Sequence, residues 1–263
     1  MNFRYRLLYK LANEYKFVPT SKLKIHPVII NFFNKYKDLF DTNDLWIKGG
    51  AARNTLSTYI NDTVNSGKHY RLISEPESPR DLDVILIKPS IEQETKVKDL
   101  LRNVCDITTV NSINDFFSSS DVDINQVLLR PDRMLFTTKA EEGFKNKIIK
   151  SKKFYTYESD WIVLRAILFS LRENLDINLD IRNDVRNANY FALLVHLFKA
   201  YSSNLQEDFF KILKKYRDDI AFNNVDDYLL FLLDNVDGFR LTDEQQKIVD
   251  EIKYNKFIDK YSD

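Results

Sequence analysis

The sequence is poor in the residues that form disulfides and zinc sites. Its 263 residues include one cysteine, Cys105, and three histidines. A single cysteine cannot form an intramolecular disulfide, which favours a reducing compartment. One cysteine and three histidines also argue against a zinc site built from these two residue types.

Net charge and long apolar runs are lacking as well. The 39 basic and 39 acidic residues cancel, so the whole chain exerts no net pull on nucleic acid, although a local basic patch stays open. No apolar run is long enough to span a bilayer, and residues 1–16 are charged throughout, unlike a signal peptide. With 44% hydrophobic and 30% charged residues, we expect a globular cytoplasmic protein with no membrane partner.

Glycine is also scarce, which makes one adjacent pair informative. Two of the five glycines are Gly49 and Gly50. They follow a short apolar run at 45–47 and precede a helix-compatible stretch at 51–60. The pattern predicts a strand-to-helix turn at which backbone amides can approach a triphosphate closely.

Two pairs of aspartates each open an apolar run. They are Asp81 with Asp83, and Asp121 with Asp123. On a strand, residues at i and i+2 point to the same face, so each pair could hold divalent metal ions. Magnesium takes few protein carboxylates and completes its shell with water and phosphate. We expect metal binding by Asp81 and Asp83, with Asp123 or Asp121 as a third carboxylate. Asp123 is favoured because it lies further inside its predicted strand.

The remaining pattern predicts a mixed α/β part followed by an all-helical part. Strands are expected at 45–48, 82–88, 104–110, 121–129, 134–136 and 147–150, and a long loop at 61–80. Helices are expected at 3–16, 27–40, 51–60, 91–103, 158–171, 181–201, 205–217, 225–234 and 243–260. A compositional shift near 150 separates the mixed part from the helical part. We therefore expect an N-terminal helical extension (1–40), a head (41–150) and a helical neck and body (151–263).

The order of these motifs carries a family resemblance over about 45–175. The segment Ile47–Asn54 resembles the Gly-Gly-x-x-Arg-Asp signature of the DNA polymerase β-like nucleotidyltransferases. Its nearest likeness is to the head and neck of class II tRNA nucleotidyltransferases and bacterial poly(A) polymerases. The segment 80–84 is similar to that branch's metal-binding Asp-x-Asp strand, 121–125 to its Asp-Phe-Thr-Ile-Asn segment, and 158–169 to its first neck helix.

The resemblance implies a fold and a set of roles. The fold would be α/β (α+β), a nucleotidyltransferase head with a small mixed sheet followed by an all-helical domain. Asp81 and Asp83 would bind two Mg²⁺ ions, or Mn²⁺ in their place, and a third carboxylate would join them in catalysis. The implied nucleotide-binding residues are Gly49, Gly50, Arg53 near the phosphates or bracing the turn, and Asn125 on the ribose side.

The sequence departs from the family pattern at several positions. The two residues that read the incoming base in the family, an Asp and an Arg, correspond to Ser159 and Ile162 here. Asn54 replaces the Asp of the first signature, and Ser119-Ser120 replaces an Arg pair. Base selection by the family's residues therefore does not carry over.

We expect a metal-dependent nucleotidyltransferase that moves a nucleoside monophosphate from an NTP to an acceptor hydroxyl and releases pyrophosphate. The favoured acceptor is an RNA 3′ end, tRNA included, so NTP and RNA are the expected partners. Two alternatives stay open. The same head could modify a protein, a tRNA or a small molecule, as toxin-type nucleotidyltransferases do, or it could be a catalytically silent binding module. The retained acid pairs argue against the second.

Overall fold

A computed structural model describes residues 15–65, 78–79, 81–150, 159–177 and 181–261. The chain divides into two compact units, Met1–Lys150 and Ser151–Asp263, and each is described by itself. Most of the helix expected at 3–16 lies outside the described residues. Within them, no helix is both long and apolar enough to cross a membrane.

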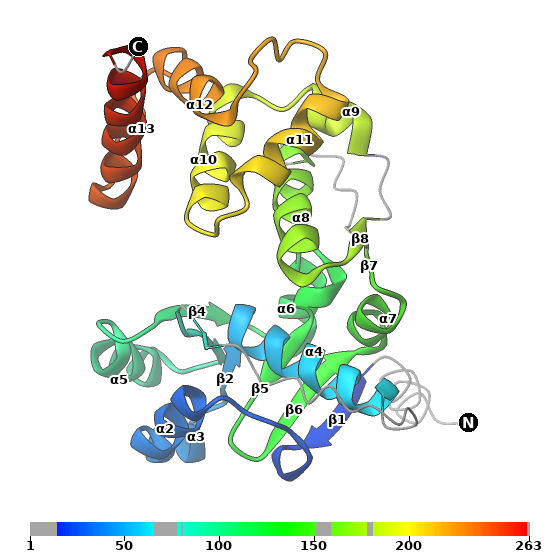
Figure 1. The fold of residues 1–263 in the computed structure, drawn as a ribbon. Coiled ribbons are helices and arrows are strands. Elements are labelled where there is room, and N and C mark those ends of the chain that lie inside the picture. The colour runs from blue at the N-terminus through cyan, green and yellow to red at the C-terminus, as the bar shows by residue number, and fades with distance from the viewer. Residues whose placement is uncertain (1–14, 66–77, 80, 151–158, 178–180, 262–263) are drawn as a thin grey trace. The chain divides into compact units, whose positions relative to one another are not determined.

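Unit 1 is built on a six-stranded sheet with the order β1-β6-β5-β2-β3-β4 (Figure 1). These strands are β1 (Tyr15–Pro19), β2 (Leu45–Lys48), β3 (Asp83–Ile87), β4 (Asp106–Val110), β5 (Val127–Leu129) and β6 (Arg133–Thr137). Only β3 and β4 pair in parallel, so the sheet is mixed, as expected. The β2–β3 register places Lys48 opposite Asp83 and so brings the glycine turn beside Asp83.

The central strands β2 and β3 are buried on both faces of this sheet. Trp46 and Ile85 pack with Phe117 of α6 (Ile113–Ser119) in one apolar cluster. Helix α4 (Gly49–Asn65) packs against β2, β3 and β5 and also against α7 (Thr138–Asn146). Helix α5 (Ile91–Leu101) packs on β4, and a short strand β7 (Ile148–Ile149) follows α7. Burial on both faces fixes β2 and β3 as the rigid centre of the unit.

The N-terminal extension is not helical throughout. Residues 15–19, which overlap the end of the helix expected at 3–16, form edge strand β1, which pairs with β6 and buries Val18. After the turn η1 (Thr20–Lys22), the helix expected at 27–40 is divided into α2 (Pro27–Lys35) and α3 (Lys37–Thr42). Between them Tyr36 has φ −113° and ψ 27°, which lies outside the α-helical region.

The strand expected at 121–129 is wrong in its first half. Residues Asp123–Asn125 form a 3₁₀ turn, η2, and only Val127–Leu129 are a strand. The carboxylates of Asp121 and Asp123 accept hydrogen bonds from the next backbone N–H, at 3.0 and 2.9 Å. Such local side-chain bonds compete with a strand ladder, so the two aspartates do not share a strand face.

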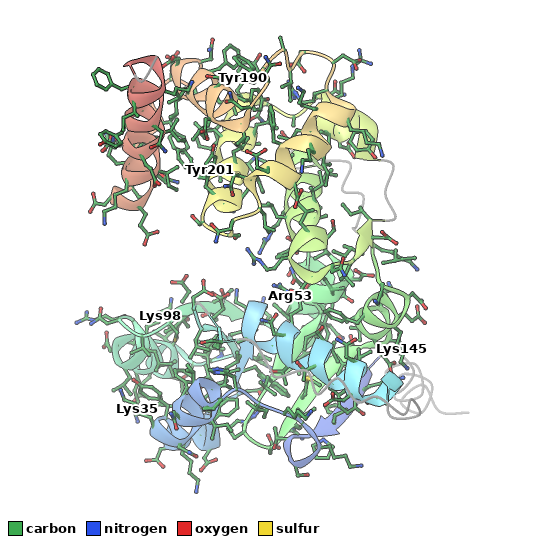
Figure 2. All side chains as sticks on the ribbon, in the orientation of Figure 1. Lys35, Arg53, Lys98, Lys145, Tyr190 and Tyr201 are labelled. Carbon is green, nitrogen blue, oxygen red and sulfur yellow. The ribbon has the colours of Figure 1, made fainter. Side chains whose placement is uncertain are left out.

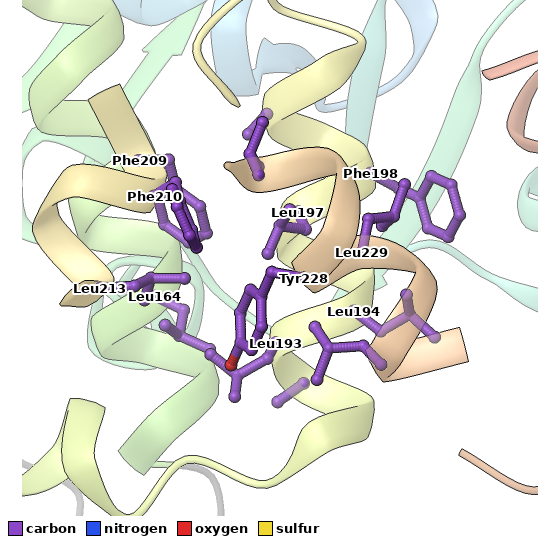
Figure 3. Close-up of a cluster of buried hydrophobic side chains, with 14 of the residues drawn as sticks. Leu164, Leu193, Leu194, Leu197, Phe198, Phe209, Phe210, Leu213, Tyr228 and Leu229 are labelled. Atoms are coloured by element: carbon purple, nitrogen blue, oxygen red, sulfur yellow. The ribbon is translucent and has the colours of Figure 1, made fainter. Parts of the chain in front are cut away.

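Unit 2 is almost entirely helical. It contains α8 (Ser159–Glu173), α9 (Ile181–Arg186), α10 (Tyr190–Tyr201), α11 (Gln206–Tyr216), α12 (Val225–Asp234), α13 (Asp243–Tyr261) and a two-residue strand, β8 (Asp176–Ile177). Its core joins Leu164, Leu193, Leu197, Phe209 and Tyr228, from four helices (Figure 3).

The helix predicted over 181–201 is two helices in the structure. Asn189 is the N-cap of α10, and its side chain accepts a hydrogen bond from the Ala192 N–H at 2.8 Å. The reciprocal capping bonds between Thr242 and Gln245 at the start of α13 agree with their spacing in the sequence.

The hydroxyl of Tyr228 is buried in this core. The side chain is 2% exposed, and its oxygen has no hydrogen-bond partner among the described residues. An unsatisfied buried hydroxyl costs about 1–3 kcal/mol, so we expect Tyr228→Phe to raise the free energy of unfolding of unit 2 by about 1 kcal/mol. Urea unfolding followed by circular dichroism measures this change.

Tyr201→Phe is the matched control, because the Tyr201 hydroxyl donates to the Asp226 carboxylate at 2.5 Å. We expect that variant to lose about 1 kcal/mol, since a bonded donor is removed. Equal destabilisation by the two substitutions contradicts the assignment of Tyr228 as unsatisfied.

His196 makes the stability of unit 2 depend on pH. The ring is fully buried, its Nδ1 lies 2.8 Å from the Ala192 carbonyl oxygen, and burial lowers its pKa to about 4. Unfolded, the same ring has a pKa of about 6.5. As pH falls from 6.5 to 4, the unfolded chain binds a proton that the folded chain does not. The free energy of unfolding therefore decreases, by up to about 3 kcal/mol, and this contribution is fully present above pH 6.5.

Trp161 reports on this effect because its ring centroid lies 5.1 Å from that of His196. Urea unfolding of a Trp46→Phe background, followed by Trp161 fluorescence at pH 7 and 4.5, measures the loss. His196→Gln keeps a neutral polar side chain, and we expect it to flatten the pH dependence. An unchanged slope in that variant assigns the acid sensitivity to another group.

Candidate active site

The glycine turn and an acidic side chain meet at one end of β2 and β3. Gly49 begins α4 with φ +69°, a backbone conformation that glycine adopts at little cost. A Cβ placed on Gly49 would lie 2.5 Å from Asp83 Oδ2. The first N–H groups of α4 have no partner within the helix and are the positive end of its dipole. The turn therefore sets backbone donors directly beside a carboxylate.

Asp81 and Asp83 occupy different settings. Asp83 is the first residue of β3 and is half-buried, whereas Asp81 precedes the strand and is exposed. Their carboxylates supply the hard oxygen donors that Mg²⁺ and Mn²⁺ prefer. Because Gly49 has no Cβ, the turn packs directly against Asp83 Oδ2. Two carboxylates are few, so a metal ion held by them would be completed by water and phosphate oxygens.

A third carboxylate does not join this pair. Within the described part of the chain, no three His, Cys, Asp or Glu residues are grouped so as to hold a metal. The structure places Asp106, which sequence reasoning missed, beside Asp83 through the parallel β3–β4 register. Local sequence patterns carry no signal for that pairing, because it depends on which strands become neighbours.

Asp123 is fastened to the backbone of unit 1. Its Oδ1 accepts hydrogen bonds from the N–H groups of Ile124 at 2.9 Å and Lys150 at 3.1 Å. Its own N–H donates to the Lys150 carbonyl at 3.1 Å. Burial raises the pKa of this carboxyl to about 6. A Cβ on Gly143 would lie 3.4 Å from Asp123 Oδ2, so α7 also packs against it. The structure thus gives Asp123 a role in joining η2 to the end of unit 1.

Arg53, Asn125 and Asp121 form a chain of polar contacts behind the turn. Arg53 lies on α4 (Figure 2), is 3% exposed, and donates from Nη1 to Asn125 Oδ1 at 2.9 Å. Asn125 Nδ2 donates to Asp121 Oδ1, also at 2.9 Å. Arg53 Nη2 lies 3.9 Å from the position of a Cβ on Gly50. Three residues singled out in the sequence are therefore brought together, and the guanidinium lies close to Gly50.

Helix α8 carries the two positions that correspond to the family's base-reading pair. Ser159 is its first residue, and Ile162 is buried at 8% exposure. The neighbouring Asp160 is buried too, and its Oδ2 accepts hydrogen bonds from the backbone and side-chain nitrogens of Asn189, at 3.3 and 3.0 Å. Asp160 therefore ties α8 to the start of α10 and is occupied within unit 2.

A cavity of about 740 Å³ lies elsewhere in unit 1. Tyr15, Phe17, Asp44 and Ile87 are among its lining residues. Asp44 precedes β2 and Ile87 ends β3, so this cavity adjoins the ends of those strands opposite to Gly49 and Asp83. The candidate active site is defined by the glycine turn and the acid pair, and this cavity is separate from it.

Comparisons with known proteins identify the fold. No protein-family model matches the chain, and no curated protein matches it. Among solved structures, the *Thermotoga maritima* CCA-adding enzyme complexed with tRNA matches with a TM-score of 0.54 and 15% identity, over 76% of this chain and 54% of that one. A CCA-adding enzyme in complex with CTP gives a TM-score of 0.52 and 16% identity, over the same shares.

A tRNA-processing enzyme in its apo form covers more of the chain. Its TM-score is 0.54 at 13% identity, over 90% of this chain and 65% of that one. This chain spans 54% of the length of the CCA-adding enzymes. At these identities the match establishes the fold, which is the fold that the CCA-adding enzymes share.

Proposed function

We propose that this protein is a magnesium-dependent nucleotidyltransferase. It transfers a nucleoside monophosphate from an NTP to an acceptor hydroxyl and releases pyrophosphate. One observation carries the proposal: on a fold shared with CCA-adding enzymes, the left-handed Gly49 leaves no room for a side chain beside Asp83 Oδ2. Backbone donors for a triphosphate and a metal-binding carboxylate are what this chemistry requires at one place.

The described residues divide the work as follows. The N–H groups around Gly49 and Gly50 bind triphosphate oxygens, and Asp81 and Asp83 hold the metal ions. When bound, the metal supplies positive charge that offsets the charge developing on the leaving pyrophosphate and polarises the attacking hydroxyl. Asp123 or Asp121 was predicted as a third carboxylate, and one oxygen of each accepts a backbone hydrogen bond, so we do not assign either to the metal. The metal site therefore rests on Asp81 and Asp83.

We propose an RNA 3′ end, tRNA included, as the acceptor. The support is the likeness to structures titled as complexes of CCA-adding enzymes with tRNA and with CTP. The choice of base rests on other residues than in that family, because Ile162 offers no hydrogen-bonding group and Asp160 is bonded to Asn189. The proposal therefore names an NTP without naming its base.

The test is transfer of label to RNA. The protein is incubated with Mg²⁺, total RNA and each of the four α-³²P-labelled NTPs, and the products are separated on a denaturing gel. We expect labelled RNA with at least one NTP, and no label after EDTA or when the RNA 3′ end has been oxidised with periodate. No transfer to any acceptor by a folded, NTP-supplied protein overturns the proposal in favour of a silent binding module.

Two observations favour a second acceptor class. The chain has no net charge, and Ile162 stands where the family places a base-reading arginine, so the features that suit an RNA substrate are reduced. If label appears on a protein or a small molecule and not on RNA, the reaction is the same but the acceptor is that of a toxin-type nucleotidyltransferase.

A further inference from the structure

We propose that Asn125 and Asp121 are positioning residues, which hold the Arg53 guanidinium beneath the Gly49-Gly50 turn. This inference rests on the proposed function and refines it, because it assigns neither residue to the ribose or to a metal ion. The family resemblance implied that Asn125 lies on the ribose side of the pocket, and the sequence left Asp121 as an alternative to Asp123 for the third metal ligand. Their contacts in the structure give them a different task.

The geometry forms a relay of two hydrogen bonds. Asn125 uses both ends of its amide: Oδ1 accepts from Arg53 Nη1, and Nδ2 donates to Asp121 Oδ1, each at 2.9 Å. Asp121 Oδ1 also accepts from the Val122 N–H at 3.0 Å. The amide group, the guanidinium and the carboxylate therefore fix one another's orientation.

The relay also answers an electrostatic need. Arg53 is 3% exposed, and a buried guanidinium is costly unless it is hydrogen-bonded and balanced by negative charge. The amide passes this interaction on to Asp121, whose carboxylate supplies the opposite charge. Asp121 Oδ1 accepts the hydrogen bonds from Asn125 and from the Val122 N–H, so this oxygen is directed at the relay, and Oδ2 is buried in the protein.

The relay connects two elements that are far apart in the sequence. Arg53 comes from the first turns of α4, whereas Asn125 is the last residue of the short turn η2 and Asp121 precedes that turn. The contact holds η2 against α4 and places the guanidinium near Gly50. Arg53 Nη2 lies 3.9 Å from the position that a Cβ on Gly50 would take. A positive charge held at that distance strengthens the binding of an anionic phosphate to the turn, without a contact from Asn125 or Asp121.

The first test measures affinity for a triphosphate that cannot react. Calorimetry with Mg²⁺ and an ATP analogue carrying a methylene group between the α and β phosphorus atoms compares wild type, Arg53→Met, Asn125→Leu and the double variant. We expect each single variant to weaken binding about tenfold and the double variant to be no weaker than Arg53→Met. A double variant weaker by about a hundredfold means independent contacts with the ligand and overturns the relay.

A matched control removes a similar amide elsewhere in unit 1. Asn43 Nδ2 donates to the Leu39 carbonyl at 3.0 Å at the end of α3. Asn43→Leu makes the same chemical change as Asn125→Leu, and we expect it to leave the affinity for the analogue within about twofold of wild type. A loss equal to that of Asn125→Leu overturns the specific role of Asn125.

The second test separates positioning from metal binding. Asp121→Asn keeps an oxygen that can accept from Asn125 and Val122, but it provides a poor metal ligand. We expect the Mg²⁺ concentration for half-maximal binding of the analogue to change less than about threefold, and to rise more than about tenfold in Asp83→Asn. Equal shifts in the two variants make Asp121 a metal ligand and overturn the assignment.

The relay and the proposed function can fail separately. If the wild-type protein binds no triphosphate, the proposed function fails. The relay is then judged by urea unfolding of the same four proteins in a Trp161→Phe background, followed through Trp46 in unit 1. A double variant whose midpoint matches the less stable single variant supports it, since the residues act as one unit, and independent shifts that add overturn it.

Discussion

Gly49→Ala is expected to reduce nucleotide transfer by at least about a hundredfold in a protein that still folds. The new Cβ would meet Asp83 Oδ2 at 2.5 Å, and the backbone there has φ +69°, which disfavours any residue with a side chain. Either the turn or the carboxylate must move. A displacement of about 1 Å at a reacting centre costs on the order of a hundredfold in rate.

Gly238→Ala separates the two causes. Gly238 has a nearly identical φ of +73°, yet nothing lies within 4 Å of the position that its Cβ would take. Both variants carry the same backbone strain, about 1–2 kcal/mol, but only Gly49→Ala crowds a carboxylate. Rates of label transfer and urea midpoints are measured for both. If Gly49→Ala transfers label at the wild-type rate, the close approach of the turn to Asp83 has no part in the reaction.

The sequence predicted the parts of the site that depend on local patterns. Short apolar runs bounded by Gly49-Gly50 and by Asp83 indicated two strands and a turn, and β2, α4 and β3 form there. A short apolar run that is followed by a glycine pair has few alternative conformations, so the local sequence was sufficient to predict the strand and the turn. The antiparallel register of Lys48 with Asp83 then closed the site, although no local signal specified it.

The predictions that failed depend on local side-chain hydrogen bonds that replace strand pairing, or on strand pairing between distant segments. Asp121 to Asn125 alternate polar and apolar residues as a strand does, but their side chains bond to the backbone and to Arg53. Periodicity counts apolar positions and cannot register such bonds. Strand β1 was missed because an edge strand needs only a partner, and β6 lies more than a hundred residues further along the chain. The pairing of Asp106 with Asp83 was hidden for the same reason.

Asp83→Asn is expected to lower transfer by on the order of a thousandfold. A bound metal contributes several kcal/mol to such a transition state, and an amide is a weak ligand in place of a carboxylate. The substitution keeps the size of the side chain, so crowding at Gly49 does not change. We therefore expect an unfolding midpoint close to that of the wild type and a much larger Mg²⁺ requirement. Initial rates of label transfer over a Mg²⁺ titration measure both effects.

Asp106→Asn is the sharpest comparison for that loss. Asp106 is aligned with Asp83 on the neighbouring strand and is exposed, but it belongs to no three-acid group within the described part of the chain. If the metal site rests on Asp81 and Asp83, removing the exposed Asp106 charge changes only an electrostatic interaction that solvent screens. We then expect less than about a threefold change in rate. A loss as large as that of Asp83→Asn instead makes Asp106 the third carboxylate. The strand pairing would then supply the third ligand in place of Asp121 or Asp123.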